Sequence, residues 1–352
     1  MSRHVARRPW YHSASIRLAC AVAMIAGLVA TTVFWPEPSV DPRAVSDDLK
    51  AGPSLRPPTS PGPTISRDPD APDVDGLLKK TQRLVERNSE ISTTFRVSSF
   101  NVLGASHTSQ GGRHARFAGG ELRMIWAVSL LNSTGIDVAG LQEFQPVQHG
   151  VFARQAPNWC VFPSASMGRE AGANAIVWRE DTWDLVESHT IEIPYFGGSP
   201  RPMPYILLEH DVTGAKVWFA NFHNPADAHG NAAHWRAAAT QRQIALANEL
   251  TADGTPLIYT GDFNDREEYF CPLTASTTMG AANGGSTGSA CAPPAQMDVD
   301  WIFGSDVISF NSYASLKEGL VARTSDHPFV WTEATATTGA PTVEQTSRDR
   351  RR

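Results

Sequence analysis

Eight side chains that can bind a metal ion or move a proton stand at the ends of short apolar runs along the 352-residue chain. The runs are rich in β-branched and aromatic residues, which is typical of buried strands. In chain order the eight are Asn101, Glu143, His223, Asp262, Asn264, Asp300, Asp326 and His327. Strands that carry such groups at one end could bring them together on one rim of a domain.

This set of groups suits the hydrolysis of a phosphate ester. That reaction needs charge neutralised on the non-bridging oxygens, an activated water and a stabilised leaving oxygen. Mg²⁺ prefers oxygen ligands and usually takes one or two protein carboxylates, so Glu143 could supply a site with help from Asn101 and Asp326. Imidazole is the usual general base near neutral pH, and a buried carboxylate at Asp300 would hold its tautomer and stabilise the imidazolium.

Each of these residues, taken alone, also has a purely structural explanation. An acidic residue at a strand end is usually a solvated cap, and Gly-Asp-x-Asn is typical of a tight turn. A lone histidine is more often partly buried and satisfied by its neighbours. The complete set in this order is therefore what indicates function.

The segments around these residues are SFNVLG, GLQEF, FANFH, TGDFND, DWIFGS and TSDHPF. In this order they resemble the signature blocks of the endonuclease/exonuclease/phosphatase superfamily, and the resemblance covers about residues 94–334. It implies an α/β fold, a four-layer sandwich of two face-to-face mixed β-sheets flanked by α-helices, with the active site at one edge. Two helical stretches, Leu122–Leu131 and Trp235–Leu250, are expected between the runs.

The resemblance also implies a metal site. Asn101 and Glu143 match the asparagine and glutamate of that site, and Asp326 belongs to the terminal Asp-His block. The expected cofactor is Mg²⁺, with Mn²⁺ as a possible substitute.

The catalytic residues implied by the resemblance are His223, Asp262, Asn264, Asp300 and His327. Asp262 and Asn264 match the pair near the nucleophile and phosphate, and His223 matches a histidine that contacts the phosphate or assists the leaving group. Asp300 matches the aspartate that pairs with His327, the candidate general base.

One feature departs from the nuclease-type pattern, in which a glutamate often orients the central histidine. The corresponding stretch reads GREAGANAIVWRE, and neither Glu170 nor Asn174 sits convincingly at that position. The residue that orients His223 therefore stays open.

The charge of the domain bears on the substrate. Residues 94–334 hold 14 Lys and Arg against 24 Asp and Glu, a net charge of −10, and only two of the cations are lysines. This argues against a broad basic surface for nucleic acid, although a bound divalent cation reverses the field locally. The loops around Gly111–His114 and Asn231–Arg236 are plausible substrate contacts or plain surface turns.

The regions outside the domain predict export. Arginines in a basic N-terminus, 1–17, precede 18 residues without a charge, 18–35, and roughly 20 apolar residues span a bilayer. This segment is read as an anchor, with a cleaved signal or a buried helix as alternatives, and the arginines keep the N-terminus cytoplasmic. A Pro-rich disordered linker, 36–75, a lead-in helix, 76–93, and a disordered tail, 335–352, complete the organisation.

The cysteines fit an oxidising compartment. Cys20 lies in the apolar segment, while Cys271 and Cys291 flank a stretch of small polar residues that has almost no apolar anchors. A disulfide bond between them would restrict this loop. Cys160 would then be a buried thiol outside the bond.

The leading hypothesis is a divalent-metal-dependent phosphodiesterase, most simply of nuclease type, that is anchored in the cell membrane or secreted and acts outside the cytoplasm. A phospholipid or inositol-type phosphoesterase is the alternative within the class. A non-catalytic surface-binding module is the alternative outside it. The membrane is an expected partner through the anchor, and no protein partner is evident.

Overall fold

The computed structural model of the protein describes residues 76, 78–80, 90–286 and 291–339. The predicted N-terminus 1–17, apolar segment 18–35 and linker 36–75 lie outside this range, as does the chain after residue 339. Among the helices within the described ranges, none is long and apolar enough to cross a membrane. The described residues from Leu78 onward belong to one unit.

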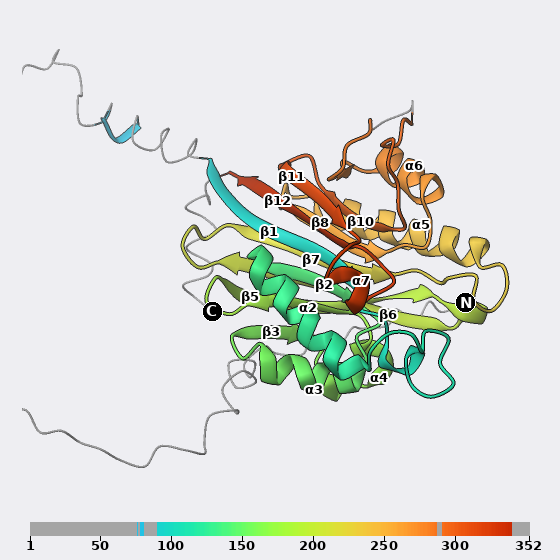
Figure 1. The fold of residues 1–352 in the computed structure, drawn as a ribbon. Coiled ribbons are helices and arrows are strands. Elements are labelled where there is room, and N and C mark those ends of the chain that lie inside the picture. Colours follow the sequence, from blue (N-terminus) through green and yellow to red (C-terminus); the bar gives the residue numbers. More distant parts are fainter. Residues whose placement is uncertain (1–75, 77, 81–89, 287–290, 340–352) are drawn as a thin grey trace, which may run out of the picture. The chain divides into compact units, whose positions relative to one another are not determined.

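The strands of this unit form two mixed six-stranded sheets (Figure 1). The first has the order β11-β12-β1-β2-β4-β3 and consists of β1 (Ile91–Asn101), β2 (Val138–Gln142), β3 (Trp159–Phe162), β4 (Ala175–Arg179), β11 (Ile308–Leu316) and β12 (Phe329–Thr338). The second has the order β5-β6-β7-β8-β10-β9 and consists of β5 (Trp183–Pro194), β6 (Pro200–His210), β7 (Lys216–His223), β8 (Leu257–Asp262), β9 (Gly280–Ala281) and β10 (Asp300–Gly304). Strand β1 pairs with β2, and β7 with β8, in parallel, while the other pairs are antiparallel.

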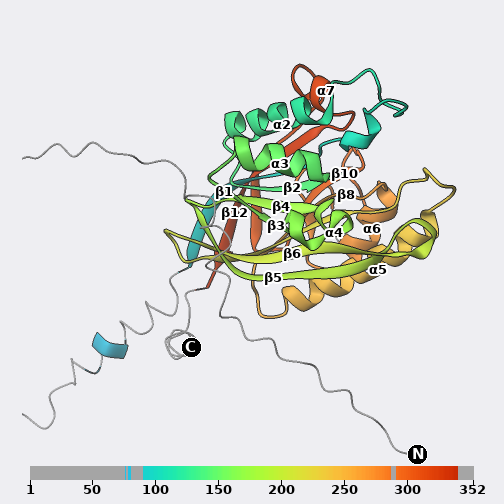
Figure 2. The ribbon, with the colours of Figure 1, turned by 90° about the horizontal axis from the view of Figure 1, so that it is seen from below.

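Helices cover the outer face of each sheet, as Figure 2 shows from below. The first sheet carries α2 (Gly120–Thr134), α3 (Pro146–Gln155) and the short α7 (Val321–Thr324), and the second carries α5 (Ala233–Leu250) and α6 (Glu267–Ser276). Single turns form η3 (Ala105–His107), η4 (Ala165–Met167), α4 (Arg169–Gly172) and η5 (Phe196–Gly198). The predicted helices Leu122–Leu131 and Trp235–Leu250 lie within α2 and α5.

Three apolar clusters fill the spaces between the four layers. One lies between the sheets and includes Val97, Ile258 and Ile302. The other two join each sheet to its helices, as Phe100 does on the first sheet and Tyr259 on the second. The alternation of side chains along each strand produces this division. The predicted four-layer sandwich is confirmed.

Pairing between β1 and β12 corrects both predicted edges of the domain. Residues 91–93 were expected at the end of a lead-in helix and residues 335–338 in a disordered tail, but both segments are strand. Ile91 pairs with Thr338 and Thr93 with Ala336, so each segment provides the backbone hydrogen-bond partners of the other.

The cysteines behave largely as expected. Cys271 on α6 and Cys291 form a disulfide bond across 20 residues, with their Cα atoms 5.5 Å apart. Cys160 on β3 lies outside this bond and is half-buried rather than buried.

Candidate active site

The candidate residues lie at one end of the gap between the sheets because of strand alternation. Residues two or four apart on a strand share a face, so Asn101 faces the same side as Val97, and Asp262 the same side as Ile258, both of the inter-sheet cluster. His223 and Asp300 stand at the ends of β7 and β10, and the same relation places them on the faces of these strands that are directed toward the other sheet.

A buried polar layer separates the apolar inter-sheet cluster from these residues. Gln142 Nε2 donates to Asn221 Oδ1 at 2.6 Å and to Ser99 Oγ at 3.3 Å, while Thr260 Oγ1 donates to Asn221 Oδ1 at 3.3 Å. Gly140 leaves room for it, since a Cβ there would collide with Thr260 and lie 2.5 Å from Asn221 Oδ1. Polar networks of this kind fix side-chain positions when their hydrogen bonds are made. The layer therefore forms a cross-sheet base for the site.

Asn101 connects two carboxylates above this layer. Its Nδ2 donates to Glu143 Oε1 at 3.2 Å and to Asp262 Oδ2 at 3.1 Å, and its Oδ1 accepts the Leu103 N–H at 3.0 Å. Asn101 thus holds the glutamate of the first sheet and the aspartate of the second sheet together.

Glu143, the residue after β2, has a partly buried carboxylate. Gly104 N–H donates to its Oε2 at 2.7 Å, and His107 Nε2 lies 3.2 Å from the same oxygen. Burial opposes ionisation, but the hydrogen bond with His107, the charge of His223 and the Gly104 N–H together hold the pKa of Glu143 well below its usual range.

His223 and Asn264 gather around Asp262. His223 Nε2 lies 3.5 Å from Asp262 Oδ2, and the ring of His223 meets that of Tyr195 edge to face at 5.9 Å. Asn264, with a φ of 54°, donates its N–H to Asp262 Oδ1 at 3.2 Å and its side chain to the Asn224 carbonyl at 2.9 Å. Asp262 is thus the carboxylate next to His223 in this structure.

The Asp300–His327 pair is the shortest contact between a histidine and a carboxylate among the described residues of the site. His327 Nδ1 lies 2.9 Å from Asp300 Oδ2 and 3.7 Å from Asp262 Oδ2. Burial raises the pKa of Asp300. Burial also acts to lower the pKa of His327, but the charges of Asp300 and Asp262 outweigh this effect and raise it. Two buried carboxylates therefore act on one imidazole.

Each of the predicted metal ligands has a polar neighbour. Asn101 and Glu143 are adjacent, whereas Asp326 is partly exposed and its Oδ2 lies 3.6 Å from His114 Nδ1. Among the described residues, Asp262, Asp300 and His327 have ligand atoms within 4.8 Å of one another. Carboxylate oxygens are the ligands that a hard divalent cation prefers, so the carboxylates of Glu143 and Asp326 fit such an ion.

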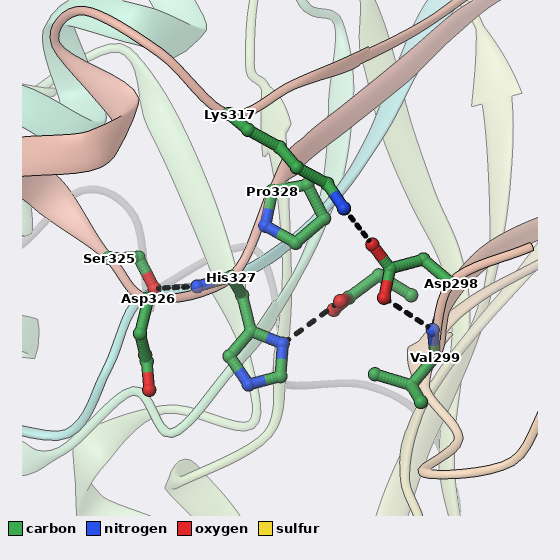
Figure 3. A pocket seen from close by; sticks show the side chains of 8 residues that line it. Asp298, Val299, Lys317, Ser325, Asp326, His327 and Pro328 are labelled. Atoms are coloured by element: carbon green, nitrogen blue, oxygen red, sulfur yellow. Dashed lines mark hydrogen bonds and ion pairs between the residues drawn. The ribbon is translucent and has the colours of Figure 1, made fainter.

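A cavity of about 190 Å³ opens beside His327 (Figure 3). On its far side Lys317 Nζ lies 2.5 Å from Asp298 Oδ2, and Val299 N–H donates to Asp298 Oδ1 at 3.0 Å. Among the described residues that line this cavity, none has a phenyl, phenol or indole ring. Its walls are therefore mainly charged and hydroxylated.

Several contributors escaped the reasoning from sequence. Gln142 and Asn221 of the polar layer are polar residues within apolar strand segments. A polar residue in a buried strand indicates a buried hydrogen-bonding partner, so the sequence contained a signal for this layer. His107 on η3 and Lys317 after β11 stand apart from the strand ends with catalytic groups, and nothing in their spacing connects them to the site. His114 lies in the segment Gly111–His114, for which the sequence offered a substrate contact as one interpretation.

The pattern that defines the Endonuclease/Exonuclease/phosphatase family matches residues 98–327. A protein of this family from Bacteroides thetaiotaomicron has a similar structure, with 19% sequence identity and a TM-score of 0.55 over 70% of this chain and 97% of that one. A mannosyl-6-phosphatase from the same organism is similar as well, with 19% sequence identity and a TM-score of 0.53 over 68% of this chain and 99% of that one. The human Nocturnin catalytic domain with bound sulfate is also similar, with 18% sequence identity and a TM-score of 0.53 over 73% of this chain and 99% of that one. No curated protein matches the sequence.

The family match covers most of the chain and includes all eight candidate residues. The chain belongs to the endonuclease/exonuclease/phosphatase family, as the resemblance predicted. It has the phosphoesterase fold of that family, and its similar structures share this fold.

Proposed function

We propose that the protein is a divalent-metal-dependent hydrolase of phosphate esters. The observation that carries this proposal is the position of the Asp300–His327 pair beside Asp262, which Asn101 connects to Glu143. An acid–base pair next to anionic ligands supplies what phosphate ester hydrolysis requires.

His327 is the proposed general base. Its Nδ1 faces Asp300, so Nε2 is the nitrogen left to take a proton from the attacking water. The Asp300 carboxylate holds the required tautomer and stabilises the imidazolium that forms. Ser325 Oγ accepts the His327 N–H at 3.1 Å and donates to the Asn101 carbonyl at 2.6 Å, which fixes this turn against β1.

Glu143 and Asp326 are the proposed anionic metal ligands, and Asn101 positions Glu143. A bound divalent cation would neutralise charge on the phosphate oxygens. Asp262 and Asn264 would orient the phosphate and water, and His223 would donate a hydrogen bond to a phosphate or leaving oxygen from beside Asp262.

Two substrate classes follow from the family, nucleic acid and small phosphate esters, and the cavity beside His327 favours the second. Stacking on aromatic rings is a common way to hold an unpaired base, but the described residues lining this cavity offer only Val299 and Pro328 as apolar surface. Lys317 and Asp298 instead offer a donor and an acceptor for hydroxyl groups. The likeness to a mannosyl-6-phosphatase supports a sugar or polyol phosphate.

A substrate panel tests the proposal. The exported protein would be assayed with Mg²⁺ and with Mn²⁺ against hexose phosphates, inositol phosphates, sphingomyelin, DNA and RNA. We expect turnover of a sugar or polyol phosphate that EDTA removes and that Glu143→Ala abolishes without unfolding the protein. Faster turnover of DNA or RNA would restore the nuclease interpretation, and no turnover of any ester would indicate a binding module.

We also propose that the domain acts outside the cytoplasm, held by the segment 18–35 or released after its cleavage. The basic N-terminus, the apolar segment and the Cys271–Cys291 disulfide support this proposal. External protease applied to intact cells should digest the domain, and protection from the protease would contradict the proposal.

A further inference from the structure

The loop between β1 and α2 places two histidines against the two carboxylates proposed as metal ligands. His107 Nε2 lies 3.2 Å from Glu143 Oε2, and His114 Nδ1 lies 3.6 Å from Asp326 Oδ2. The two imidazole rings are 6.2 Å apart and meet edge to face. Each carboxylate thus has one imidazole nitrogen beside it.

A glycine turn brings the two histidines together. Gly111 has a φ of 83°, and a Cβ on Gly112 would lie 2.5 Å from the His107 carbonyl carbon, so the chain can close only with glycine at that position. The turn returns His114 to His107, whose carbonyl accepts the His114 N–H at 2.9 Å.

Arg123 fixes the loop to both halves of the site. Its buried guanidinium donates to the Val102 carbonyl at 2.6 Å, to the Thr324 carbonyl at 3.0 Å and to Thr108 Oγ1 at 3.3 Å. These contacts join the end of β1, the segment before Asp326 and the histidine loop itself. The positions of the histidines are therefore set by the fold rather than by their ion pairs alone.

The nitrogen–oxygen separations match those of neighbouring ligands on one metal ion. With bonds of about 2.1 Å, adjacent donors are about 3.0 Å apart in an octahedral site and about 3.4 Å apart in a tetrahedral one. The Glu143–His107 separation of 3.2 Å falls between these values, and the Asp326–His114 separation of 3.6 Å is slightly larger.

We propose that His107, with His114 beside it, turns this site into a mixed nitrogen and oxygen site that selects a transition ion such as Mn²⁺ over Mg²⁺. This inference rests on the metal ligands of the proposed function. Mg²⁺ is bound chiefly by oxygen, whereas imidazole nitrogen favours first-row transition ions. An imidazole ligand should therefore raise the affinity for Mn²⁺ more than that for Mg²⁺.

The test measures metal binding rather than turnover. Metal-free full-length protein would be titrated with Mn²⁺ by electron paramagnetic resonance, with Mg²⁺ as competitor, for the wild type and for His107→Gln/His114→Gln. The matched control is His189→Gln, since His189 forms a comparable pair with Glu187 at 3.1 Å on β5. We expect the Mn²⁺ to Mg²⁺ affinity ratio to fall at least tenfold in the double variant and to stay unchanged in the control.

Electron spin echo spectra of bound Mn²⁺ should show coupling to a directly bound nitrogen, lost in the double variant. If the double variant is unstable, His107→Gln and His114→Gln are measured separately, provided that their thermal melting is unchanged. An unchanged ratio without nitrogen coupling would overturn the inference while leaving a metal-dependent hydrolase intact. Hydrolysis by protein that binds neither ion would overturn the metal part of the proposed function as well.

Discussion

Removing the charge of Asp300 tests whether it and His327 act as one unit. Asp300→Asn keeps the shape of a fully buried side chain whose Oδ2 lies 2.9 Å from His327 Nδ1. At an effective dielectric of 20, two unit charges 4 Å apart interact by about 4 kcal/mol. The imidazolium is only partly formed in the transition state, so a loss of about 10²–10³ in kcat is expected, since about 1.4 kcal/mol is tenfold.

The second part of this prediction concerns the double variant. His327→Ala should lower kcat by about 10²–10⁴, the usual contribution of a general base. Asp300→Asn added to it should cost little more, because members of one catalytic unit are not additive. Steady-state kinetics on a sugar phosphate would measure the cycle, with circular dichroism as the folding control. Two modest losses that simply add would refute the pair.

The pH profile provides an independent check of the same pair. The carboxylates of Asp300 and Asp262 raise the pKa of His327, and the base works only when the imidazole is neutral. Activity should therefore increase as the pH rises above 6.5, the ordinary pKa of histidine. Asp300→Asn removes one of these charges, lowers the pKa and should move the acid limb to lower pH. An acid limb that does not move would contradict the electrostatic argument.

Three further predictions concern other parts of the structure. Gly140→Ala should lower the free energy of unfolding by about 1–3 kcal/mol in denaturant melts, because the Cβ of the alanine would overpack the polar layer around Asn221. Unchanged stability would contradict the role of that layer. Lys317→Met should raise KM for a sugar phosphate about tenfold, which is the effect of one lost hydrogen bond to a charged group. KM for p-nitrophenyl phosphate should stay unchanged, and Lys216→Met is the control variant. Equal effects on both substrates would contradict a role of Lys317 in specificity. Cys271→Ser should lower the free energy of unfolding by about 3 kcal/mol on the chain-entropy relation for a 20-residue separation, and a loss below 1 kcal/mol would show that the loop is held by other contacts.

The sequence was most informative where a chemical group ends a strand. Asn101, Asp262 and Asp300 could be predicted to converge because each stands at the end of a short apolar run, and such strand ends can meet on one rim of a domain. The arrangement in two face-to-face sheets was predicted from the resemblance, and the order of strands within each sheet was not predicted, because alternation alone does not specify which strands are neighbours.

Residues in loops could not be placed in the same way. His107 reaches Glu143 only because a glycine turn and Arg123 fold its loop over the end of β2. The domain edges were misplaced for a related reason, because residues 91–93 and 335–338 have no strong strand pattern and become strand by pairing with each other.

The most direct test of the central claim is phosphorus-31 nuclear magnetic resonance of a mixture of phosphate esters incubated with the full-length protein and Mn²⁺. We predict that one class of ester disappears and its product accumulates, and that EDTA or Glu143→Ala stops the reaction. A spectrum that stays unchanged, for a protein shown to be folded and loaded with metal, would contradict the assignment of this edge as the active site of a phosphoesterase.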